Sequence, residues 1–288
     1  MGEKKRDALG DRMKMFEDME GKRRFIPGLP LVARIDGRSF SNFTHGLERP
    51  YDQRFSKLMV EITKFLVDET GAKIGYTQSD EISLLFYSDD LQSEIFFNGR
   101  VQKMVSILAG LASARFNKIR EDFLPNHKPH ATPVFDARVW TFPNQIQATS
   151  CFVWREQDAT KNSISMLAQH YFSHKQLMYK NTKEMIRMLE VEHNVFWDTY
   201  PNFFKRGTYV QRKSHFVSLP EEALQSLPPG HEARHNPNFK VERHSIVALD
   251  LPILTRIQNR IGVIFHGEEP VEMQMQDDFI DDIEGSRI

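Results

Sequence analysis

Two short acidic segments contain the residue types that metal-dependent phosphoryl chemistry requires. Asp36 and Gly37 follow one apolar run, while Ser79, Asp80 and Glu81 lie between two others. Two divalent cations in such a reaction are bound by hard oxygen ligands, so at least two carboxylates must come together. Asp-Gly and Ser-Asp pairs are also common in turns, and either segment alone favours a plain turn. Their combination predicts a metal-dependent site formed by Asp36 and Asp80.

The segment that begins at Asp36 could also place backbone groups near a triphosphate. Gly37 lets the backbone approach a metal or a phosphate closely, and its carbonyl oxygen is a neutral hard ligand. Backbone amides of this turn could face the phosphate oxygens, while Arg38 adds positive charge. The turn that could form this site consists of Asp36, Gly37, Arg38, Ser39, Phe40 and Ser41.

The apolar patterns around these residues predict the elements that position them. The run 31–35 predicts a buried strand, and apolar residues three and four apart over 52–68 predict a helix that covers a sheet. Two antiparallel strands flank the turn 78–81, and a helix over 101–119 precedes a strand over 134–140. This order predicts an α+β, ferredoxin-like fold, an antiparallel sheet with both helices on one face. In that fold the two acidic segments meet at one edge of the sheet.

The composition is that of a folded protein without a strong overall charge. The chain has 288 residues, 40% of them hydrophobic and 27% charged, with a formal net charge of -1, so any contact with RNA must be local. Its single cysteine, Cys151, fits a reducing cytoplasm. No run of about 18 apolar residues predicts a membrane span. P-loop and nucleophile-elbow motifs are absent, which argues against P-loop NTPases and α/β-hydrolases.

Motifs along most of the chain follow an order that one enzyme family shares. The matching segments are RIDGRSFSNFT at 34–44, RPYDQRF at 49–55, YTQSDEISLLF at 76–86, FDARVWTFP at 135–143, WREQDATKNSI at 154–164, FKRG at 204–207 and LDLP at 249–252. Together they resemble the tRNA(His) guanylyltransferase superfamily, most closely its Thg1-like branch of 3′-to-5′ polymerases.

The resemblance implies a nucleotidyltransferase with a polymerase-type palm that works in the direction opposite to ordinary polymerases. It implies that ATP activates the 5′-monophosphate of a tRNA, and that the 3′-hydroxyl of GTP or another NTP then attacks the activated end. The implied cofactor is Mg²⁺, as two ions, and the implied partners are tRNA and nucleoside triphosphates. The family also suggests a homotetramer or a homodimer.

The resemblance assigns roles to individual acidic residues. Asp36, the Gly37 carbonyl and Asp80 match the metal ligands of the family. Glu81 matches a further acidic position of the catalytic site, with a role outside the direct ligands of the metal. The expected catalytic residues are therefore Asp36, Asp80 and Glu81.

Further positions match residues near the nucleotide. Arg49 and Asp52 align with a basic and an acidic residue close to the activated end, although a surface ion pair or a helix cap explains them equally well. Lys205 or Arg206 in FKRG is a candidate for another phosphate contact, although a surface ion pair or a helix cap explains them equally well. The full expected set for the nucleotide is Asp36, Gly37, Arg38, Ser39, Phe40, Ser41, Arg49, Asp52, Ser79, Asp80 and Lys205.

Two departures from the eukaryotic guanylyltransferases bear on the substrate. Ser41 stands where those enzymes carry a histidine, and residues 160–166 read TKNSISM where they carry an HINNLYN motif. The branch without that motif tends toward template-dependent repair of 5′-truncated tRNAs. We therefore expect repair, with addition of G to tRNA(His) as a possible overlapping activity.

Two other functions compete with this interpretation. A palm-type nucleotidyl cyclase uses the same two carboxylates, but the chain lacks a GG[DE][ED]F-like turn. A non-catalytic RNA-binding protein would leave two acids close together without cations, which would repel each other.

The chain is expected to divide into three parts. Residues 1–143 form the palm, which includes an amphipathic helix over 8–20 that packs on it by one face. Residues 144–215 form a helical extension that contacts tRNA or nucleotide. Residues 216–288 form a strand segment and an acidic tail, packed on the palm or trailing from it.

Overall fold

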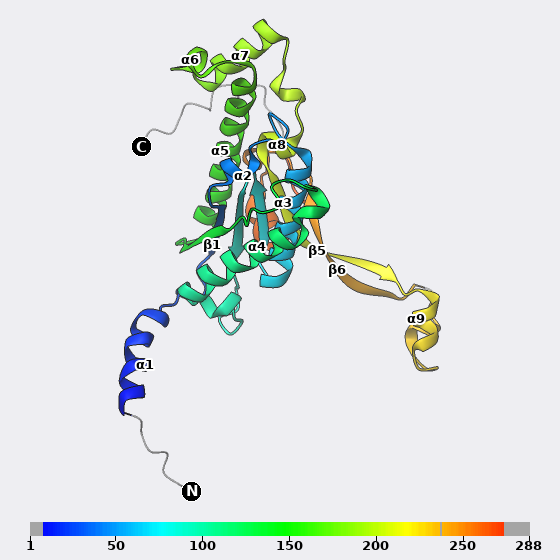
Figure 1. The fold of residues 1–288 in the computed structure, drawn as a ribbon. Helices are drawn as coiled ribbons and strands as arrows, with labels where there is room; N and C mark the ends of the chain where they lie inside the picture. The colour runs from blue at the N-terminus through cyan, green and yellow to red at the C-terminus, as the bar shows by residue number, and fades with distance from the viewer. Residues whose placement is uncertain (1–7, 237, 274–288) are drawn as a thin grey trace.

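Six strands form one antiparallel sheet at the centre of the protein (Figure 1), in the order β4-β1-β3-β2-β5-β6. The computed structural model describes residues 8–236 and 238–273, and the acidic tail expected around 277–282 lies outside them. The strands are β1 Leu31–Gly37, β2 Ile74–Gln78, β3 Glu81–Phe86, β4 Phe135–Thr141, β5 Thr208–Ser218 and β6 Lys240–Leu249. The first four have the predicted ferredoxin-like order, so the predicted fold class is confirmed.

Two long helices cover one face of this sheet, as predicted. They are α3 Gln53–Thr70 and α4 Val101–Phe123, each connecting two strands of the palm. Their apolar faces meet alternate residues of the strands, among them Leu31 and Ile35 of β1, in one buried cluster. Gly71 ends α3 in the left-handed conformation at φ 67°.

The opposite face of the sheet is covered by α5 Gln145–Tyr171 and α10 Arg260–His266. The first half of α5 contributes Ala148 and Phe152 to a second cluster, together with Val32 of β1. This second layer was not predicted, because the sequence pattern indicated only a helical extension beyond residue 144. In β1, successive side chains thus alternate between the two helical layers.

The second half of α5 carries the predicted helical extension. It packs with α6 His174–Leu177, α7 Thr182–His193 and α8 Asn202–Arg206 around a third buried cluster that includes Leu167 and Leu189. Figure 1 shows these helices beyond the end of the sheet.

Strand β5 crosses the boundary expected at residue 215. It runs from Thr208 to Ser218, pairs with β2 at Thr77↔Thr208, and so continues the palm sheet. Beyond the sheet, β5 and β6 extend as a two-stranded arm with α9 Glu221–Ser226 at its tip (Figure 1). Residues 208–215 therefore belong to a strand and not to the helical extension.

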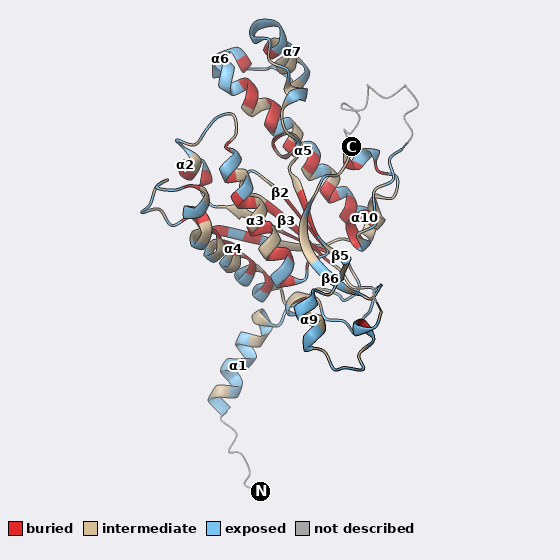
Figure 2. Ribbon diagram, turned by 90° about the vertical axis from the view of Figure 1, so that its right-hand side faces the viewer, coloured by how far each residue is buried: buried red, intermediate tan, exposed pale blue. Residues whose placement is uncertain are grey.

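The N-terminal helix α1 Ala8–Gly21 forms as predicted, but it does not pack on the palm. It contains no buried residue, and Phe16 is 56% exposed. Figure 2 shows α1 projecting away from the body of the protein. The spacing of its apolar residues Leu9, Met13 and Phe16 gives the helix an apolar stripe, but no other part of the described chain covers that stripe. Within the described chain, no helix is both long and apolar enough to cross a membrane.

The remaining short helices are α2 Phe40–Thr44, η1 Phe96–Gly99, η2 Trp197–Thr199, η3 Glu232–Arg234 and η4 Leu254–Arg256.

Candidate active site

The predicted acidic residues lie together at one end of the sheet. In the antiparallel pairing of β1 with β3, Asp36 stands opposite Glu81, and the backbone amide of Gly37 donates a hydrogen bond of 3.2 Å to the Asp80 carbonyl. The amide of Arg38 donates to the Val134 carbonyl at 2.9 Å. The carboxyl end of β1 is thus fixed between the β2–β3 turn and the chain leading into β4.

Gly37 is required by how closely the chain folds at this point. A Cβ atom on Gly37 would lie 2.4 Å from a ring carbon of Phe40 and 2.9 Å from the Oδ2 atom of Asp80. Distances this short do not occur for real side chains, so no other residue fits without displacing the Phe40 ring or the carboxylate. The Asp80 carboxylate therefore lies directly over the backbone that carries Asp36.

Asp80 occupies an environment that disfavours its charge. Burial raises the pKa of its carboxyl group, and the neighbouring Asp36 raises it further. The Ser79 hydroxyl donates a hydrogen bond of 3.1 Å to Oδ1 of Asp80 and partly offsets these effects. A cation between the two carboxylates would relieve this repulsion, so the donor set fits a divalent metal.

The described residues do not form a complete metal cage. No three His, Cys, Asp or Glu side chains in the described ranges come close enough to bind one metal ion. The candidate ligands are three hard oxygen groups, namely the carboxylates of Asp36 and Asp80 and the carbonyl of Gly37. Such an open site suits Mg²⁺, which keeps several positions for water and phosphate oxygens.

Glu81, the third predicted acid, is bound by an arginine of α5. Both oxygens of Glu81 accept hydrogen bonds from Arg155, at 2.7 Å from Nε and 2.8 Å from Nη2. Burial raises the pKa of Glu81, and the charges of Arg155 and Arg34 oppose that effect. Glu81 thus lies at the site, but its carboxylate is engaged by the helix above the sheet.

The turn after Asp36 divides into exposed and buried residues. Arg38, Ser39 and Ser41 are exposed, and Ser39 adopts the left-handed conformation at φ 57°. The Phe40 side chain is only 2% exposed and packs against other phenylalanines, the nearest being Phe135 with ring centroids 4.8 Å apart. Any contact of Phe40 with a nucleotide is therefore limited to its backbone.

Asp52 acts as the N-cap of α3. Its Oδ1 atom accepts hydrogen bonds from the amides of Arg54 at 2.9 Å and Phe55 at 3.4 Å, and Oδ2 pairs with the Arg54 guanidinium at 2.6 Å. Burial raises the pKa of Asp52, but the hydrogen bonds from Arg54 and Glu48 outweigh it and lower the pKa. The helix-cap interpretation accounts for this residue, and contact of Asp52 or the exposed Arg49 with a nucleotide stays a prediction.

Lys205 lies in a separate polar cleft of about 480 Å³. Its Nζ atom donates a hydrogen bond of 2.6 Å to the Asp198 carbonyl and lies over the Trp197 ring. Arg206 and Asp250 line the same cleft, whereas Asp36 and Asp80 do not. Lys205 and the two aspartates thus do not line one cleft, and the expected phosphate contact of Lys205 stays a prediction.

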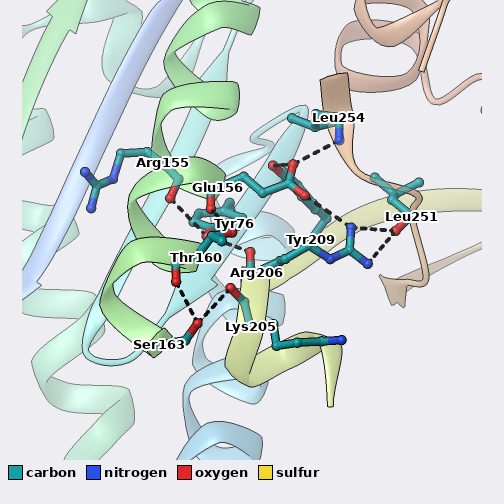
Figure 3. A network of polar contacts seen from close by, with 10 residues as sticks. All are labelled: Tyr76, Arg155, Glu156, Thr160, Ser163, Lys205, Arg206, Tyr209, Leu251 and Leu254. Atoms are coloured by element: carbon teal, nitrogen blue, oxygen red, sulfur yellow. Dashed lines mark hydrogen bonds and ion pairs between the residues drawn. The ribbon is translucent and has the colours of Figure 1, made fainter. Parts of the chain in front are cut away.

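A buried polar network supports the wall of this cleft (Figure 3). Glu156 of α5 is 3% exposed and pairs with Arg206 at 3.2 Å, while its other oxygen accepts a hydrogen bond from the Leu254 amide at 3.0 Å. The Tyr76 hydroxyl donates to the Arg206 carbonyl at 2.8 Å. The network joins α5, β2, α8 and the segment that follows β6.

Sequence reasoning did not find Arg155 and Glu156. Both lie in the WREQD segment at 154–158, where adjacent residues of opposite charge are typical of an exposed helix. The sequence did contain one signal. Phe152 and Ala159, which lie three or four positions from Arg155 and Glu156, are apolar, and this spacing places them near the same side of the helix. Their partners, however, are distant in the sequence.

Comparisons with known proteins agree with this architecture. A family model described as "Thg1: tRNAHis guanylyltransferase" matches residues 10–143. A solved bacterial tRNA(His) guanylyltransferase (Thg1)-like protein in complex with ATP has a TM-score of 0.73 and 32% identity, over 90% of this chain and 100% of that one. A complex of such a bacterial protein with GTP has a TM-score of 0.65 and 29% identity, over 89% of this chain and 97% of that one.

One relative comes from a virus. An uncharacterized protein of Acanthamoeba polyphaga mimivirus is 34% identical over 228 residues, which span 72% of this chain and 78% of that protein.

The similarity of the solved structures extends well beyond the palm, so it includes the helical extension and the C-terminal strands.

Proposed function

Because the chain belongs to the tRNA(His) guanylyltransferase family, whose members are nucleotidyltransferases, we propose that it adds nucleotides to the 5′ end of tRNA. The observation that carries this proposal is that Asp80 lies against Gly37 at the end of β1, close enough to Asp36 to feel its charge. Two carboxylates and a backbone carbonyl suit a metal-bound triphosphate, because so few protein ligands leave positions on the metal for phosphate oxygens. Asp36, Asp80 and Gly37 would hold Mg²⁺, which neutralises charge on phosphate oxygens when it is bound.

The chain's own residues would position the reacting groups. The exposed turn at Arg38, Ser39 and Ser41 offers a guanidinium, backbone amides and hydroxyls to a triphosphate next to the carboxylates. The rigid attachment of β1 to β3 and β4 keeps this turn in one place, which favours in-line attack. Ser79 orients Asp80 through its hydrogen bond.

We propose ATP as the activator and GTP or another NTP as the added nucleotide. The tRNA 5′-phosphate would attack the α-phosphorus of ATP and release pyrophosphate, giving an adenylylated end. The 3′-hydroxyl of the incoming NTP would then attack the 5′-phosphorus of the tRNA in this adenylylated end and release AMP. The solved relatives in complex with ATP and with GTP support both nucleotides.

Template-dependent repair is the activity that the α5 segment favours. Residues 160–166, where eukaryotic enzymes carry a different motif, lie inside α5. Ser163 is fully buried, and its hydroxyl accepts a hydrogen bond of 3.1 Å from the Trp197 indole. Since Ser163 and Ile164 are buried in packing and only Lys161 and Asn162 of this segment are exposed, we propose that pairing with the template, and not a dedicated reader in this segment, selects the nucleotide.

Addition to a shortened tRNA tests the proposal. The purified protein is incubated with Mg²⁺, ATP, four NTPs and a 5′-phosphorylated tRNA(His) lacking its first nucleotide, and the 5′ end is followed on a gel. We expect templated growth that is lost in Asp36→Asn and Asp80→Asn and retained in the exposed control Asp122→Asn. Absence of growth in the folded wild-type protein would contradict the proposal, and a cyclic nucleotide product would indicate a cyclase.

Two further expectations accompany this function. We propose a homodimer or homotetramer, which sedimentation with and without tRNA would test. We also propose a cytoplasmic location, which agrees with the buried, unpaired thiol of Cys151. Fractionation of cells that express the protein would test the location.

A further inference from the structure

Arg155 of α5 forms a two-point contact across the acidic end of the sheet. Its guanidinium donates to both oxygens of Glu81 at 2.7 and 2.8 Å, and its side chain is 11% exposed. Nη1 also pairs with Asp158 at 3.1 Å, and the guanidinium lies 4.6 Å from the centre of the Trp154 ring. A planar guanidinium held on three sides has a fixed orientation.

The carboxylate that it binds is the one adjacent to the metal candidates. Glu81 directly follows Asp80 in the chain and faces Asp36 across the β1–β3 pair. Residues opposite each other on neighbouring strands point to the same face of the sheet, with Cβ atoms about 5 Å apart. Glu81 is therefore the acidic neighbour of the metal candidates on the face of the sheet that carries Asp36, although its carboxylate, as Arg155 holds it, does not complete a three-ligand group with them.

We propose that Arg155 is a positioning residue, which withholds the Glu81 carboxylate from the cations that Asp36 and Asp80 bind. This inference rests on the proposed function, because it explains why only two carboxylates bind the metal in that reaction. By holding both oxygens of Glu81, Arg155 sets the ligand number and the net charge at the end of β1.

The charges at this end of the sheet give the direction of the effect. Asp36, Asp80 and Glu81 are opposed by Arg155 and more weakly by Arg34, whose Nε atom lies 4.0 Å from Glu81. Loss of the Arg155 guanidinium adds one net negative charge and releases a third carboxylate. A divalent cation then binds more tightly, but in a position shifted toward Glu81 and less suited to the reaction.

Binding of Mn²⁺ to the full-length protein, without nucleotide or tRNA, tests this inference. The free Mn²⁺ signal in electron paramagnetic resonance gives the dissociation constant. We expect Arg155→Met to bind Mn²⁺ several-fold more tightly than the wild type, while its kcat for 5′ addition falls at least tenfold at saturating Mg²⁺. A structural role of Arg155 alone would lower activity without tightening metal binding.

A double-mutant cycle separates withholding from direct ligation. Glu81→Gln removes the negative charge opposite Arg155 and should weaken Mn²⁺ binding, whereas Arg155→Met combined with Glu81→Gln should restore it to about the wild-type value. If Glu81 ligates the metal directly, the double variant would bind as weakly as Glu81→Gln, which would overturn the inference. Asp158→Asn is the matched control, because it removes another contact of Arg155 and leaves Glu81 held.

Arg155→Lys provides a second route if the methionine variant does not fold. A lysine keeps the charge but cannot hold both carboxylate oxygens, so intermediate tightening is expected and an unchanged constant would contradict the inference. Failure of the proposed function is distinguishable. If Asp36→Asn and Asp80→Asn bind Mn²⁺ like the wild type, the metal site itself is wrong, whatever Arg155 does.

Discussion

The carboxylate of Glu156 and the guanidinium of Arg206 form an ion pair of 3.2 Å beneath the polar cleft. Glu156 lies on α5, and Arg206 ends α8, with one residue between it and the start of β5. Because the Leu254 amide donates to the same carboxylate, one side chain connects three segments that are far apart in the sequence. This connection explains how the C-terminal segment is fixed on the palm.

Glu156→Ala is expected to destabilise the protein more than most single substitutions. It leaves the Arg206 guanidinium without its carboxylate and the buried Leu254 amide without an acceptor, which costs about 2–4 kcal/mol of unfolding free energy. Equilibrium urea denaturation measures the change. Glu156→Gln is the control, since its amide oxygen still accepts from Leu254 and should lose about half as much. Equal losses in both variants would contradict this account.

Gly37→Ala is expected to abolish most activity. The added methyl group would displace the Phe40 ring or the Asp80 carboxylate, and a shift of about 1 Å at reacting groups costs on the order of 100-fold in kcat. Gly110→Ala is a matched control, because a Cβ on Gly110 meets no atom within 4 Å. The control should keep full activity and gain about 0.5–1 kcal/mol of stability, as alanine favours the interior of α4.

Asp52 predicts a specific pH dependence of stability. Its pKa in the folded protein lies below the usual value of 3.8, so its ionised form stabilises the folded state above that pH. The contribution disappears as the pH falls through the lowered pKa. Asp52→Asn keeps the cap but removes the charge, so the stability difference from the wild type, about 1 kcal/mol near pH 7, should vanish on acidification. Chemical denaturation at a series of pH values measures it, and a constant difference would argue against the charge.

Cys151 is expected to resist thiol reagents in the folded protein. Burial raises the pKa of its thiol to about 11, so almost no thiolate exists at neutral pH. Labelling with a disulfide reagent near neutral pH should be slow in buffer and rapid in urea. Fast labelling of the folded protein, with no loss of structure, would show that α5 opens around Cys151.

Local patterns predicted the elements that hold the acidic residues. The strand ending at Asp36 and the hairpin around Ser79 and Asp80 depend on alternation and turn residues within a few positions of the chain. The ferredoxin-like order of strands and helices then predicted that this strand and this hairpin belong to one sheet. The palm and the position of its acids therefore follow from the amino-acid sequence alone.

Non-local contacts explain what the sequence did not reveal. Strand β5 pairs with β2 across more than a hundred residues, and most of its outer half is exposed, so it lacks the buried alternation of a central strand. Arg155 is 74 residues from Glu81 in the chain, and no spacing rule connects them. For α1, periodicity defines an apolar stripe around Phe16 but not whether another element lies near it.

The adjacent positions of Arg155 and Glu156 restrict how the length of the chain can change. Their side chains point away from each other, one toward the acidic end of the sheet and the other toward the polar cleft (Figure 3). Each inserted or deleted residue turns an α-helix by roughly 100°, so a single-residue insertion near the start of α5 would turn both residues away from their partners together. Insertions that leave the protein working should instead occur at the tip of the β5–β6 arm, which makes that tip the place to attach a tag or a reporter domain.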